Sequence, residues 1–544
     1  MKRLFLFLAS AAALWSSACS GGGGTTILPP PTGKFGQSSL NGTYAFVTNG
    51  EVFSGGATGS LSRTGSFIAN GSGQIMGGIE DVVESSSGQI LQTLGVTITG
   101  GTYTINANGT GNINLNATAN GVPSTITFGI TLTSASGGLL IDETFPTAQS
   151  GNQESTGSGN FFLQNEADCS NPTGSVSGNY IFDFSGVDSA GNPESLVGQF
   201  AVSGGVITTG ITDTNDGGAL ASGAIGTGSF GTDPQIAAGA NSCGRGLATI
   251  GGSTYEYYVV DATRIRLISI NTGAMLTGDA FVQTNTIPAS ASALNSNFAY
   301  LVAGTDTSGN GFFITRTGRF STNGSTVTNA LVDTNDGGNE GGKFSQTSVA
   351  SPASTVTYDP TTGRGTVTFK DPNLAIPFSF VFYLSSATQG VIQDTTQLNG
   401  LAADVADGSF DAQTGNPFSG SNITGTYAMN WTGLSQQVQG PDEEDLVGQA
   451  TISSLGISGT ADIFQFESSF GPQTGNLLGG TITIPGDGAG DDLKRNMMPV
   501  TITKNGTTIT INCVIYFVNP QLAFFANTSA SSNRDIAGVL QLQP

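Results

Sequence analysis

The sequence predicts an all-β protein of four tandem repeats of about 120 residues, each a roughly eight-stranded antiparallel barrel or barrel-like sandwich. Three observations support this fold class. Gly is abundant at 81 of 544 residues, yet 37% of the chain is hydrophobic and only 10% is charged, which excludes a disordered polyelectrolyte and a collagen. Short runs of alternating apolar and polar residues lie between Gly-rich breaks, as in strands. Three sequence landmarks also recur four times in one order.

The N-terminal residues 1–18 are typical of an export signal, because a basic start precedes an apolar stretch from Leu4 to Leu14 and then small residues. This stretch is too short to be a permanent membrane-spanning helix. The run SACSGGGG resembles the processing site of bacterial lipoproteins, in which the cysteine, here Cys19, becomes the lipidated first residue. The alternative is ordinary cleavage nearby, with Cys19 discarded. We expect an exported protein with a lipidated Cys19 and a Gly/Pro-rich tether over residues 19–38.

Four copies of one unit follow, each marked by the same three landmarks. The start signals are LNGTYAF from Leu40, VSGNYIF from Val176, LNSNFAY from Leu294 and ITGTYAM from Ile423. The end signals, Gly then four residues then Gln, begin at Gly159, Gly278, Gly408 and Gly538. Between them, Gly followed by any residue and then Phe or Ala recurs at Gly65, Gly198, Gly318 and Gly448. This repetition predicts domains at residues 39–165, 172–284, 290–414 and 420–544.

Within each unit, alternation with a period of two predicts about eight strands. In PFSFVFYLSS, Phe378, Phe380 and Phe382 share one strand face, so this strand buries that face. Hairpin turns are expected at Thr361–Gly365 and at Asn108–Gly109. A closed barrel would remove the exposed edges of such a sheet, which favours it over the alternatives, an immunoglobulin-like sandwich or a propeller with two blades per unit.

The combined motifs are similar to those of a known group of proteins. The lipoprotein-like N-terminus, GTYAF, the GSF landmark, a GG-I-x-D strand end and the terminal G-x-x-x-x-Q together resemble the repetitive β-rich lipoproteins of soil bacteria. The resemblance covers nearly the whole mature chain. It implies location and architecture, and it implies no catalytic residue, because that family has no assigned activity.

Charge and residue content exclude several classes of function. After removal of the signal, 14 basic residues face 38 acidic ones, a balance of −24, which repels nucleic acid and anionic lipid heads. Membrane attachment would then depend on the lipid at Cys19 alone. His is absent, which excludes Ser-His-Asp and Cys-His catalysis, and no CxxC pair is present to bind zinc. Carboxylate chemistry and hard-cation binding remain.

The motif DTNDGG occurs twice, at Asp213–Gly218 and Asp333–Gly338. One Asp of this motif recurs in all four units, at Asp81, Asp213, Asp333 and Asp462, and a second acid follows in three, at Glu84, Asp216 and Asp336. An EF-hand calcium loop needs an oxygen ligand at its fifth position, where this motif has Gly. We therefore expect a turn that ends the third strand of each unit. Weak calcium binding is the alternative, with Asp213, Asp216, Asp333 and Asp336 as the candidate ligands.

Three further cysteines lie in the repeats. Cys169 and Cys243 could form a disulfide in an oxidising compartment or remain two unpaired thiols. Cys513 shares a strand face with apolar residues and is expected to be a small buried side chain.

Other polar clusters are expected to be solvated. The acids Asp442–Asp445 are assigned to a loop between the first two strands of the last unit. Arg264 and Arg266 share one strand face that could point to solvent or bind an anion, and we expect solvent because the other units have no matching pair. Tyr255 and Tyr257 are expected in the core.

We therefore expect a non-enzymatic, lipid-anchored cell-envelope protein with a structural, adhesive or ligand-binding role, since tandem units favour multivalent contact. Ser20 after Cys19 is not an acidic retention signal, so the outer membrane or cell surface is the expected location. Its partner would be an extracellular glycan or protein, and no cofactor is expected apart from calcium. One alternative is a lipocalin-like container for a small ligand. The other is a carboxylate-based carbohydrate-active enzyme, which four near-equivalent units disfavour.

Overall fold

The structure is a computed structural model that describes most of the chain from residue 35 to residue 544. The segments outside the described residues are 1–34, 55–56, 87, 147–153, 235–243, 285, 308–312, 338, 341–343, 347–353, 371–376, 399, 403, 416–417, 436–441, 467–470, 485–494, 505 and 529–533. Cys19, its tether and Cys243 therefore lie outside the described residues.

The strands form four consecutive antiparallel sheets, which we call barrels 1 to 4. In barrel 1, β8 pairs with β1 and closes the sheet, and a 3-10 helix, η1 (Gln37–Ser39), precedes it. Its strands are β1 (Asn41–Ser54), β2 (Ala57–Asn70), β3 (Gln74–Ser86), β4 (Gln89–Ile105), β5 (Thr110–Ala119), β6 (Val122–Ser134), β7 (Gly137–Thr144) and β8 (Glu154–Leu163).

Barrel 2 follows two short helices, α1 (Glu166–Cys169) and α2 (Pro172–Ser175), and the pairing of β10 with β11 completes its ring. Its strands are β9 (Gly178–Asp188), β10 (Pro193–Ser203), β11 (Val206–Asp216), β12 (Ala219–Ala224), β13 (Gly228–Thr232), β14 (Arg245–Ile250), β15 (Ser253–Asp261), β16 (Arg264–Ser269) and β17 (Ala274–Val282).

Barrel 3 is an open half-barrel in the described part of the chain, with a single bridge between Thr326 and Thr355 at the gap. After η2 (Ala291–Ala293) come β18 (Asn295–Asp306), β19 (Phe313–Asn323), β20 (Val327–Asp336), β21 (Asn339–Glu340), β22 (Phe344–Gln346), β23 (Thr355–Tyr358), β24 (Arg364–Phe369), β25 (Phe378–Leu384), β26 (Gln389–Asp394) and β29 (Asp404–Ala412). A separate hairpin is formed by β27 (Gln397–Leu398) and β28 (Leu401–Ala402).

Barrel 4 is closed by the pairing of β30 with β37. Its strands are β30 (Gly425–Ser435), β31 (Asp442–Ser453), β32 (Gly456–Gln465), β33 (Gln473–Thr481), β34 (Asn496–Lys504), β35 (Thr507–Asn519), β36 (Leu522–Asn527) and β37 (Arg534–Leu542). The predicted fold class of four all-β barrel repeats is confirmed.

Side chains fill the interior of each barrel. In barrel 3, Phe380 and Phe382 lie in a cluster with Phe298, Phe320 and Phe410, as the alternation of the sequence predicted. Tyr255 and Tyr257 lie in the corresponding cluster of barrel 2, and Cys513 lies in that of barrel 4, so all three are core residues as expected. Burial of large aromatic rings supplies much of the hydrophobic free energy of such a core.

The middle Gly landmark is explained by this packing. It lies on the second strand of each barrel, opposite a large residue of the first strand. A Cβ at Gly65 would lie 2.7 Å from the ring of Phe46, and one at Gly318 would lie 2.8 Å from the hydroxyl of Tyr300. In the first three barrels the absence of a side chain therefore makes room for an aromatic ring, and in barrel 4 the residue opposite is Met429.

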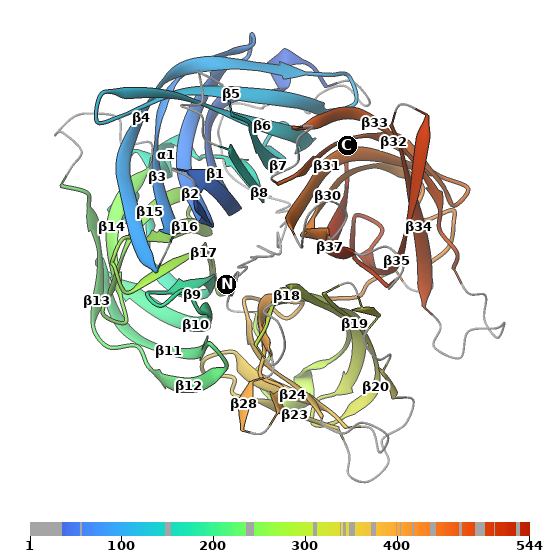
Figure 1. Cartoon of the computed structure of the whole chain (residues 1–544). Coiled ribbons are helices and arrows are strands. Elements are labelled where there is room, and N and C mark those ends of the chain that lie inside the picture. The colour runs from blue at the N-terminus through green and yellow to red at the C-terminus, as the bar shows by residue number, and fades with distance from the viewer. Residues whose placement is uncertain are drawn as a thin grey trace.

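The four barrels are arranged head to tail around a common centre (Figure 1). At each junction, the first strands of one barrel contact the last three strands of the next: β2 lies against β16, β10 against β29, β19 against β36, and β31 against β7. The last of these contacts joins barrel 4 to barrel 1 and closes the ring. A head-to-tail interface that closes after four units is a cyclic arrangement, here made within one chain.

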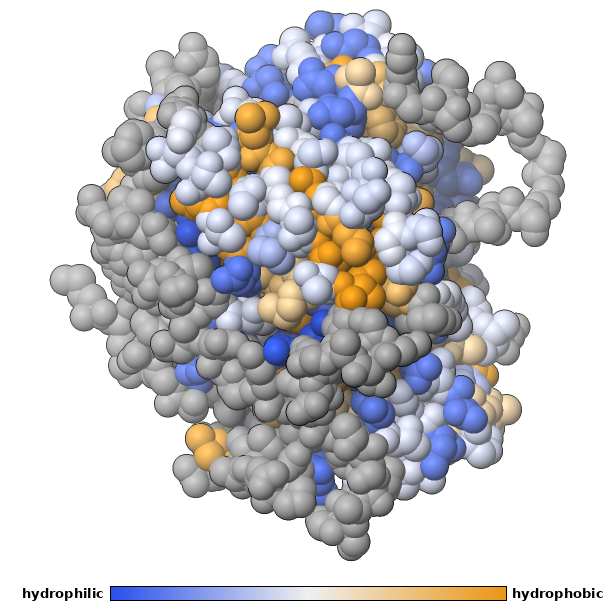
Figure 2. All heavy atoms as spheres, turned by 90° about the vertical axis from the view of Figure 1, so that its right-hand side faces the viewer, coloured by the Kyte–Doolittle hydropathy of each residue, from blue (hydrophilic) through white to orange (hydrophobic). Residues whose placement is uncertain are grey.

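Apolar clusters fill these junctions. Leu301 of β18 and Phe524 of β36 belong to one buried cluster, which also includes Ile141 of β7. On the face shown in Figure 2, apolar residues lie in groups between polar ones. Each barrel is thus a closed or nearly closed β-sheet whose outer surface is partly buried by its two neighbours.

Two predicted solvated clusters are buried instead, because they lie at junctions. Asp442 to Asp445 begin β31 rather than a loop, and Asp445 accepts a hydrogen bond of 2.6 Å from Thr156 of barrel 1. Arg264 stacks 4.0 Å from the ring of Phe162 of barrel 1, and Arg266 donates to the carbonyl oxygen of Asn160 at 2.9 Å. Both expectations were wrong because the neighbouring barrel covers these faces.

In the described part of the chain, the helices are all too short to cross a membrane.

Candidate functional site

The recurring Asp lies at the junction between each barrel and the next. In every copy this Asp on the third strand pairs with the residue of the second strand that precedes the middle Gly landmark. The pairs are Thr64–Asp81, Val197–Asp213, Thr317–Asp333 and Val447–Asp462. The alignment that the sequence suggested is therefore confirmed by strand register. In three of the four copies the Asp binds an Arg and a Tyr of the next barrel, an arrangement that we call a carboxylate lock.

The lock between barrels 1 and 2 is built on Asp81. Arg245 donates from Nε to one oxygen of Asp81 and from Nη2 to the other, each at 2.8 Å. Tyr258 donates its hydroxyl proton to the same carboxylate at 2.7 Å. Glu256 lies 3.1 Å from Nη2 of Arg245, and Asp233 is also in contact with this guanidinium. A planar guanidinium and a carboxylate form two parallel charge-assisted bonds, which is the strong geometry for such a pair.

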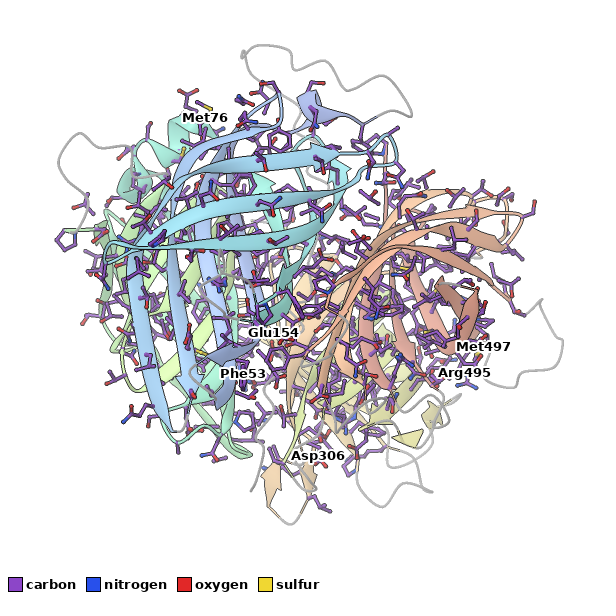
Figure 3. The ribbon with its side chains drawn as sticks, turned by 45° about the horizontal axis from the view of Figure 1, so that its top comes forward. Phe53, Met76, Glu154, Asp306, Arg495 and Met497 are labelled. Atoms are coloured by element: carbon purple, nitrogen blue, oxygen red, sulfur yellow. The ribbon has the colours of Figure 1, made fainter. Side chains whose placement is uncertain are left out.

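The two DTNDGG motifs provide the next two locks. Asp213 accepts two hydrogen bonds of 2.7 Å from Arg364 and one of 2.6 Å from Tyr383, both in barrel 3. Asp333 accepts hydrogen bonds of 2.5 Å from Arg495 and from Tyr516 of barrel 4. Figure 3 labels Arg495 on barrel 4, just before β34.

The acids expected as weak calcium ligands do not converge. Asp213 and Asp216 are three positions apart on one strand, as are Asp333 and Asp336, so the members of each pair point to opposite faces. Burial raises the pKa of Asp216 and that of Asp336. Within the described ranges, no group of three or more acidic or thiol side chains is placed to hold a metal ion. Calcium binding stays a prediction, and the structure shows Asp213 and Asp333 engaged with Arg and Tyr.

The Gln that ends each repeat donates a hydrogen bond across the same junction, which gives a structural reason for the recurring end signal. Gln164 donates to the carbonyl oxygen of Val259 at 2.6 Å, and Gln283 donates to that of Leu384 at 2.7 Å. Gln413 donates to that of Phe517 at 2.6 Å. Each of these bonds reaches the next barrel along the chain.

The ring is closed by the same bond. Gln543, near the end of the chain, donates to the carbonyl oxygen of Leu132 in barrel 1 at 2.6 Å. All four junctions therefore share one glutamine bond, and the junction from barrel 4 to barrel 1 is equivalent to the other three.

That fourth junction lacks the Arg and the Tyr. Equivalent positions in barrels 1, 2 and 3 can be identified from one backbone hydrogen bond that each barrel has at a hairpin turn. In this bond the N–H of Leu132, Val259 or Leu384 donates to the carbonyl oxygen of Gly109, Gly244 or Gly363. In each barrel, the residue that follows this glycine pairs with the residue that precedes the N–H donor. These pairs are Arg245 with Tyr258, Arg364 with Tyr383, and Thr110 with Thr131. Two threonines therefore stand where the other junctions have a guanidinium and a phenol.

A pocket of about 540 Å³ lies at this place. Its wall includes Thr110 and Asn112 of barrel 1 and Thr460 and Asp462 of barrel 4. Asp462 accepts a hydrogen bond of 2.7 Å from the backbone N–H of Gly475, as Asp81 does from Gly95 at 2.8 Å. Burial raises the pKa of Asp462 above its usual value. Among the described residues, no cation is paired with it.

A second carboxylate lies beside the pocket. Glu143 of β7 is 3% exposed, and Asn112 donates to its Oε2 at 3.5 Å. Its Oε1 is buried without a hydrogen-bond partner in the described structure. Burial, then the carboxylates of Asp462 and Asp142, raise the pKa of Glu143 well above its usual range. Buried polar atoms are normally paired, so this oxygen is an exception that needs a cause.

The sequence carried a signal for this pocket that our prediction did not use. The turn reads GRG at Gly244–Gly246 and at Gly363–Gly365 but GTG at Gly109–Gly111. Because the Asp recurs in four units and the Arg is missing from this turn, the sequence shows that one of the four aspartates has no matching arginine. The Arg–Asp pairing itself could not be read from the sequence, because it connects residues about 150 positions apart in different units, for example Asp213 and Arg364.

The cysteine pair is described in part. Cys169 is buried at the end of α1 and forms no disulfide within the described residues. Cys243 is outside the described residues, but a Cβ on its neighbour Gly244 would lie 2.9 Å from the Cβ of Cys169. The chain next to Cys243 therefore reaches Cys169, and the disulfide stays a prediction.

Comparison with known proteins gives no family. No family model matches the chain, and no curated relative matches it. Among solved structures, a transferrin-binding protein B double mutant from Haemophilus parasuis is 10% identical, covers 76% of this chain and 85% of its own, and has a TM-score of 0.20. Transferrin-binding protein B from serogroup B Neisseria meningitidis is 12% identical, with coverages of 76% and 86% and a TM-score of 0.18. A protein with unknown function from Nostoc punctiforme is 8% identical, with coverages of 47% and 98% and a TM-score of 0.13.

Proposed function

We propose that this chain is a non-enzymatic, lipid-anchored protein of the cell envelope that binds a ligand between its first and last barrels. The observation that carries the proposal is the pocket at the fourth junction, where a binding arrangement present at three equivalent places is incomplete. Ligand sites are concave and are commonly formed between rigid units.

The remainder of the molecule suits a rigid support for that pocket. Three junctions are held by buried carboxylate locks, and all four are held by a glutamine bond. A binding site gains affinity when its walls are held in place before the ligand arrives, because less ordering is needed on binding.

The two alternative functions have less support. A container needs a hollow barrel, whereas the interior of barrel 3 is filled by rings such as Phe320 and Phe410, which lie 6.4 Å apart.

A carboxylate-based enzyme needs accessible acids. Asp445 and Glu444 are buried, and they accept hydrogen bonds from Thr156 and Arg534. Asp445 therefore joins barrel 4 to barrel 1, Glu444 pairs within barrel 4, and we propose no catalytic residue.

The anchoring part of the proposal is tested by fractionation. Wild-type protein and a Cys19→Ala variant are expressed with their N-terminal segment, and envelope fractions are probed. We expect wild type in the membrane fraction and the variant in the soluble exported fraction. Equal distribution of the two proteins would refute lipid anchoring at Cys19.

The binding part is tested by a thermal-shift screen of the full mature chain against a diverse panel of small molecules and peptides. The comparison protein carries Thr110→Arg and Thr131→Tyr, which place in barrel 1 the residues that fill the other three junctions. We expect ligands that raise the melting temperature of wild type and not that of the filled variant. Stabilisation that is equal in both proteins would show that the pocket is not the site.

A further inference from the structure

We infer that the pocket at the fourth junction binds a guanidinium group, which Asp462 holds as its three counterparts hold an arginine of the next barrel. This inference rests on the proposed binding function and adds the chemical class of the ligand. It follows from the near-fourfold repetition of the molecule, which provides three occupied copies of the same site.

The first step is the identity of the group held at the equivalent positions. Asp81, Asp213 and Asp333 each accept hydrogen bonds from an arginine side chain of the following barrel. Asp462 occupies the same register, and it accepts a backbone hydrogen bond from the neighbouring strand as Asp81 does. Its position in the strand is therefore that of a guanidinium acceptor in the other three copies. The planar fork of a guanidinium matches two carboxylate oxygens, which a single ammonium point charge does not.

The second step is the unsatisfied carboxylate beside it. At the junction of barrels 1 and 2, a second acid, Glu256, lies 3.1 Å from the guanidinium of Arg245. At the fourth junction, Glu143 supplies a second acid, and its Oε1 has no partner within the described residues. The two carboxyl groups interact electrostatically, since Asp462 contributes to the raised pKa of Glu143, and a cation bound beside them would stabilise their ionised forms. The carboxylate of Asp462 therefore lines the pocket, and that of Glu143 lies beside it, bonded to the lining residue Asn112.

The third step is that the described residues of barrel 1 offer no free basic side chain to Asp462. Between residues 35 and 165 the only basic residue is Arg63. Its guanidinium lies 3.3 Å from Asp142 and 3.7 Å from Glu80, so it is already paired. Thr110 and Thr131 are too short to carry charge to Asp462, and they leave the space that an arginine and a tyrosine occupy elsewhere. Arg495 and Arg534 of barrel 4 are paired with Asp333 and Glu444. Among the described side chains of barrels 1 and 4, no basic group is left for Asp462, and we expect a ligand to supply the cation.

The remaining wall groups suit such a ligand. Thr460 accepts a hydrogen bond of 3.1 Å from Asn108 across the junction, and both residues line the pocket. Their hydroxyl and amide oxygens provide acceptors for the outer N–H groups of a guanidinium, which has five donors in total. A volume of about 540 Å³ admits a guanidinium together with the alkyl chain that bears it.

Isothermal titration calorimetry on the full mature chain tests the inference. The probes are agmatine, arginine, a short peptide with an internal arginine, and, as neutral and ammonium counterparts, citrulline and lysine. We expect agmatine, arginine or the peptide to bind, with lysine at least about tenfold weaker and citrulline without measurable heat. Tighter binding of the peptide than of agmatine would place the guanidinium on a protein partner, and the reverse would place it on a small molecule.

Two variants locate the site. Asp462→Asn keeps the size of the side chain and is expected to lower the affinity for agmatine by at least about tenfold. The pair Thr110→Arg and Thr131→Tyr is expected to abolish binding by occupying the pocket from within. Glu166→Gln, an exposed acid on α1, is the control and should bind as wild type does.

Three results would overturn the inference. They are the absence of heat from every guanidinium probe at millimolar concentration, binding of calcium or lysine in preference to guanidinium, and guanidinium binding that survives in Asp462→Asn. The proposed function would survive them if the screen described above found another ligand that the filled variant excludes, so the two failures are distinguishable.

Discussion

At the residue scale, one carboxylate per repeat determines how the barrels are joined. A buried charge is costly unless it is paired and hydrogen-bonded, and the locks satisfy this condition with an arginine and a tyrosine from the next barrel. The motif DTNDGG looked like a turn or a weak metal loop in the sequence. Its first Asp is a contact between domains, which turn chemistry alone does not reveal.

The four equivalent aspartates allow one matched series of substitutions to Ala. Asp81→Ala leaves Arg245, whose side chain is fully buried, without its main partner, and should lower the free energy of unfolding by about 3–5 kcal/mol. Asp213→Ala should cost less, about 1.5–3 kcal/mol, because the side chain of Arg364 is 28% exposed. Asp462→Ala removes a carboxylate that is paired with no described cation and should be neutral or stabilising. Urea unfolding of wild type and these three variants checks this order, and a cost at Asp462 equal to that at Asp81 would contradict it.

Several buried acids have no cation beside them among the described residues, and their raised pKa values should make the free energy of unfolding fall as pH rises. Burial raises the pKa of Asp411 to about 7, against a hydrogen bond from Gln389 that lowers it. Between about pH 4 and that value the folded state holds a proton that the unfolded chain has released, so stability decreases with pH by up to about 1.4 kcal/mol per unit. Asp445 and Glu194, each with a pKa of about 7, act in the same direction.

Asp411→Asn tests the sign of this effect. The amide cannot ionise, so the free energy of unfolding of the variant should depend less steeply on pH than that of wild type. Urea unfolding at about pH 5, 6 and 7 measures both slopes. Identical slopes would show that Asp411 does not keep its proton in the folded state.

At the element scale, the sequence was sufficient for strands that face a barrel interior. The period-2 pattern of β25 placed Phe380 and Phe382 inside because their environment is set by their own barrel. The prediction of solvent exposure was wrong for β31 and β16, because a neighbouring barrel buries their charged residues. Alternation describes which residues share a face, and it contains no information on what covers that face.

The glutamine that ends each repeat should contribute to every junction. Gln413→Ala leaves the carbonyl oxygen of Phe517 without this donor and should lower the free energy of unfolding by about 1–3 kcal/mol. Thermal unfolding of Gln413→Ala beside Gln397→Ala, an exposed glutamine of β27, measures the difference. An equal and small effect of both substitutions would show that the junction bond contributes nothing particular.

The segment that contains Cys243 should be tied to α1 by a disulfide. Alkylation of the denatured protein with and without prior reduction, followed by intact mass measurement, counts the free thiols. We expect two additional alkylated thiols after reduction, because Gly244 already lies beside Cys169. The Cys169→Ser variant should lose this difference, and an unchanged mass in wild type would exclude the pairing.

At the scale of the whole molecule, the repeats form one closed ring rather than a string of independent domains (Figure 1). The prediction of tandem barrels was correct, but the ring could not be predicted, since it depends on contacts such as that between Gln543 and Leu132, at opposite ends of the chain. Because the apolar junction clusters extend over several barrels, partial unfolding of one barrel exposes surface on its neighbours.

The ring therefore predicts that the full chain unfolds in one cooperative transition. Calorimetry should give a calorimetric enthalpy equal to the van't Hoff enthalpy, as for a two-state protein. Leu301→Glu places a charge in the junction cluster of barrels 3 and 4 and should split the transition into more than one step. Phe380→Ala, which creates a cavity inside barrel 3 at a cost of about 3–5 kcal/mol, is the control and should lower the melting temperature while preserving one transition. Several transitions in wild type would mean that the barrels fold independently and that the junctions, including the one with the pocket, are not held rigidly.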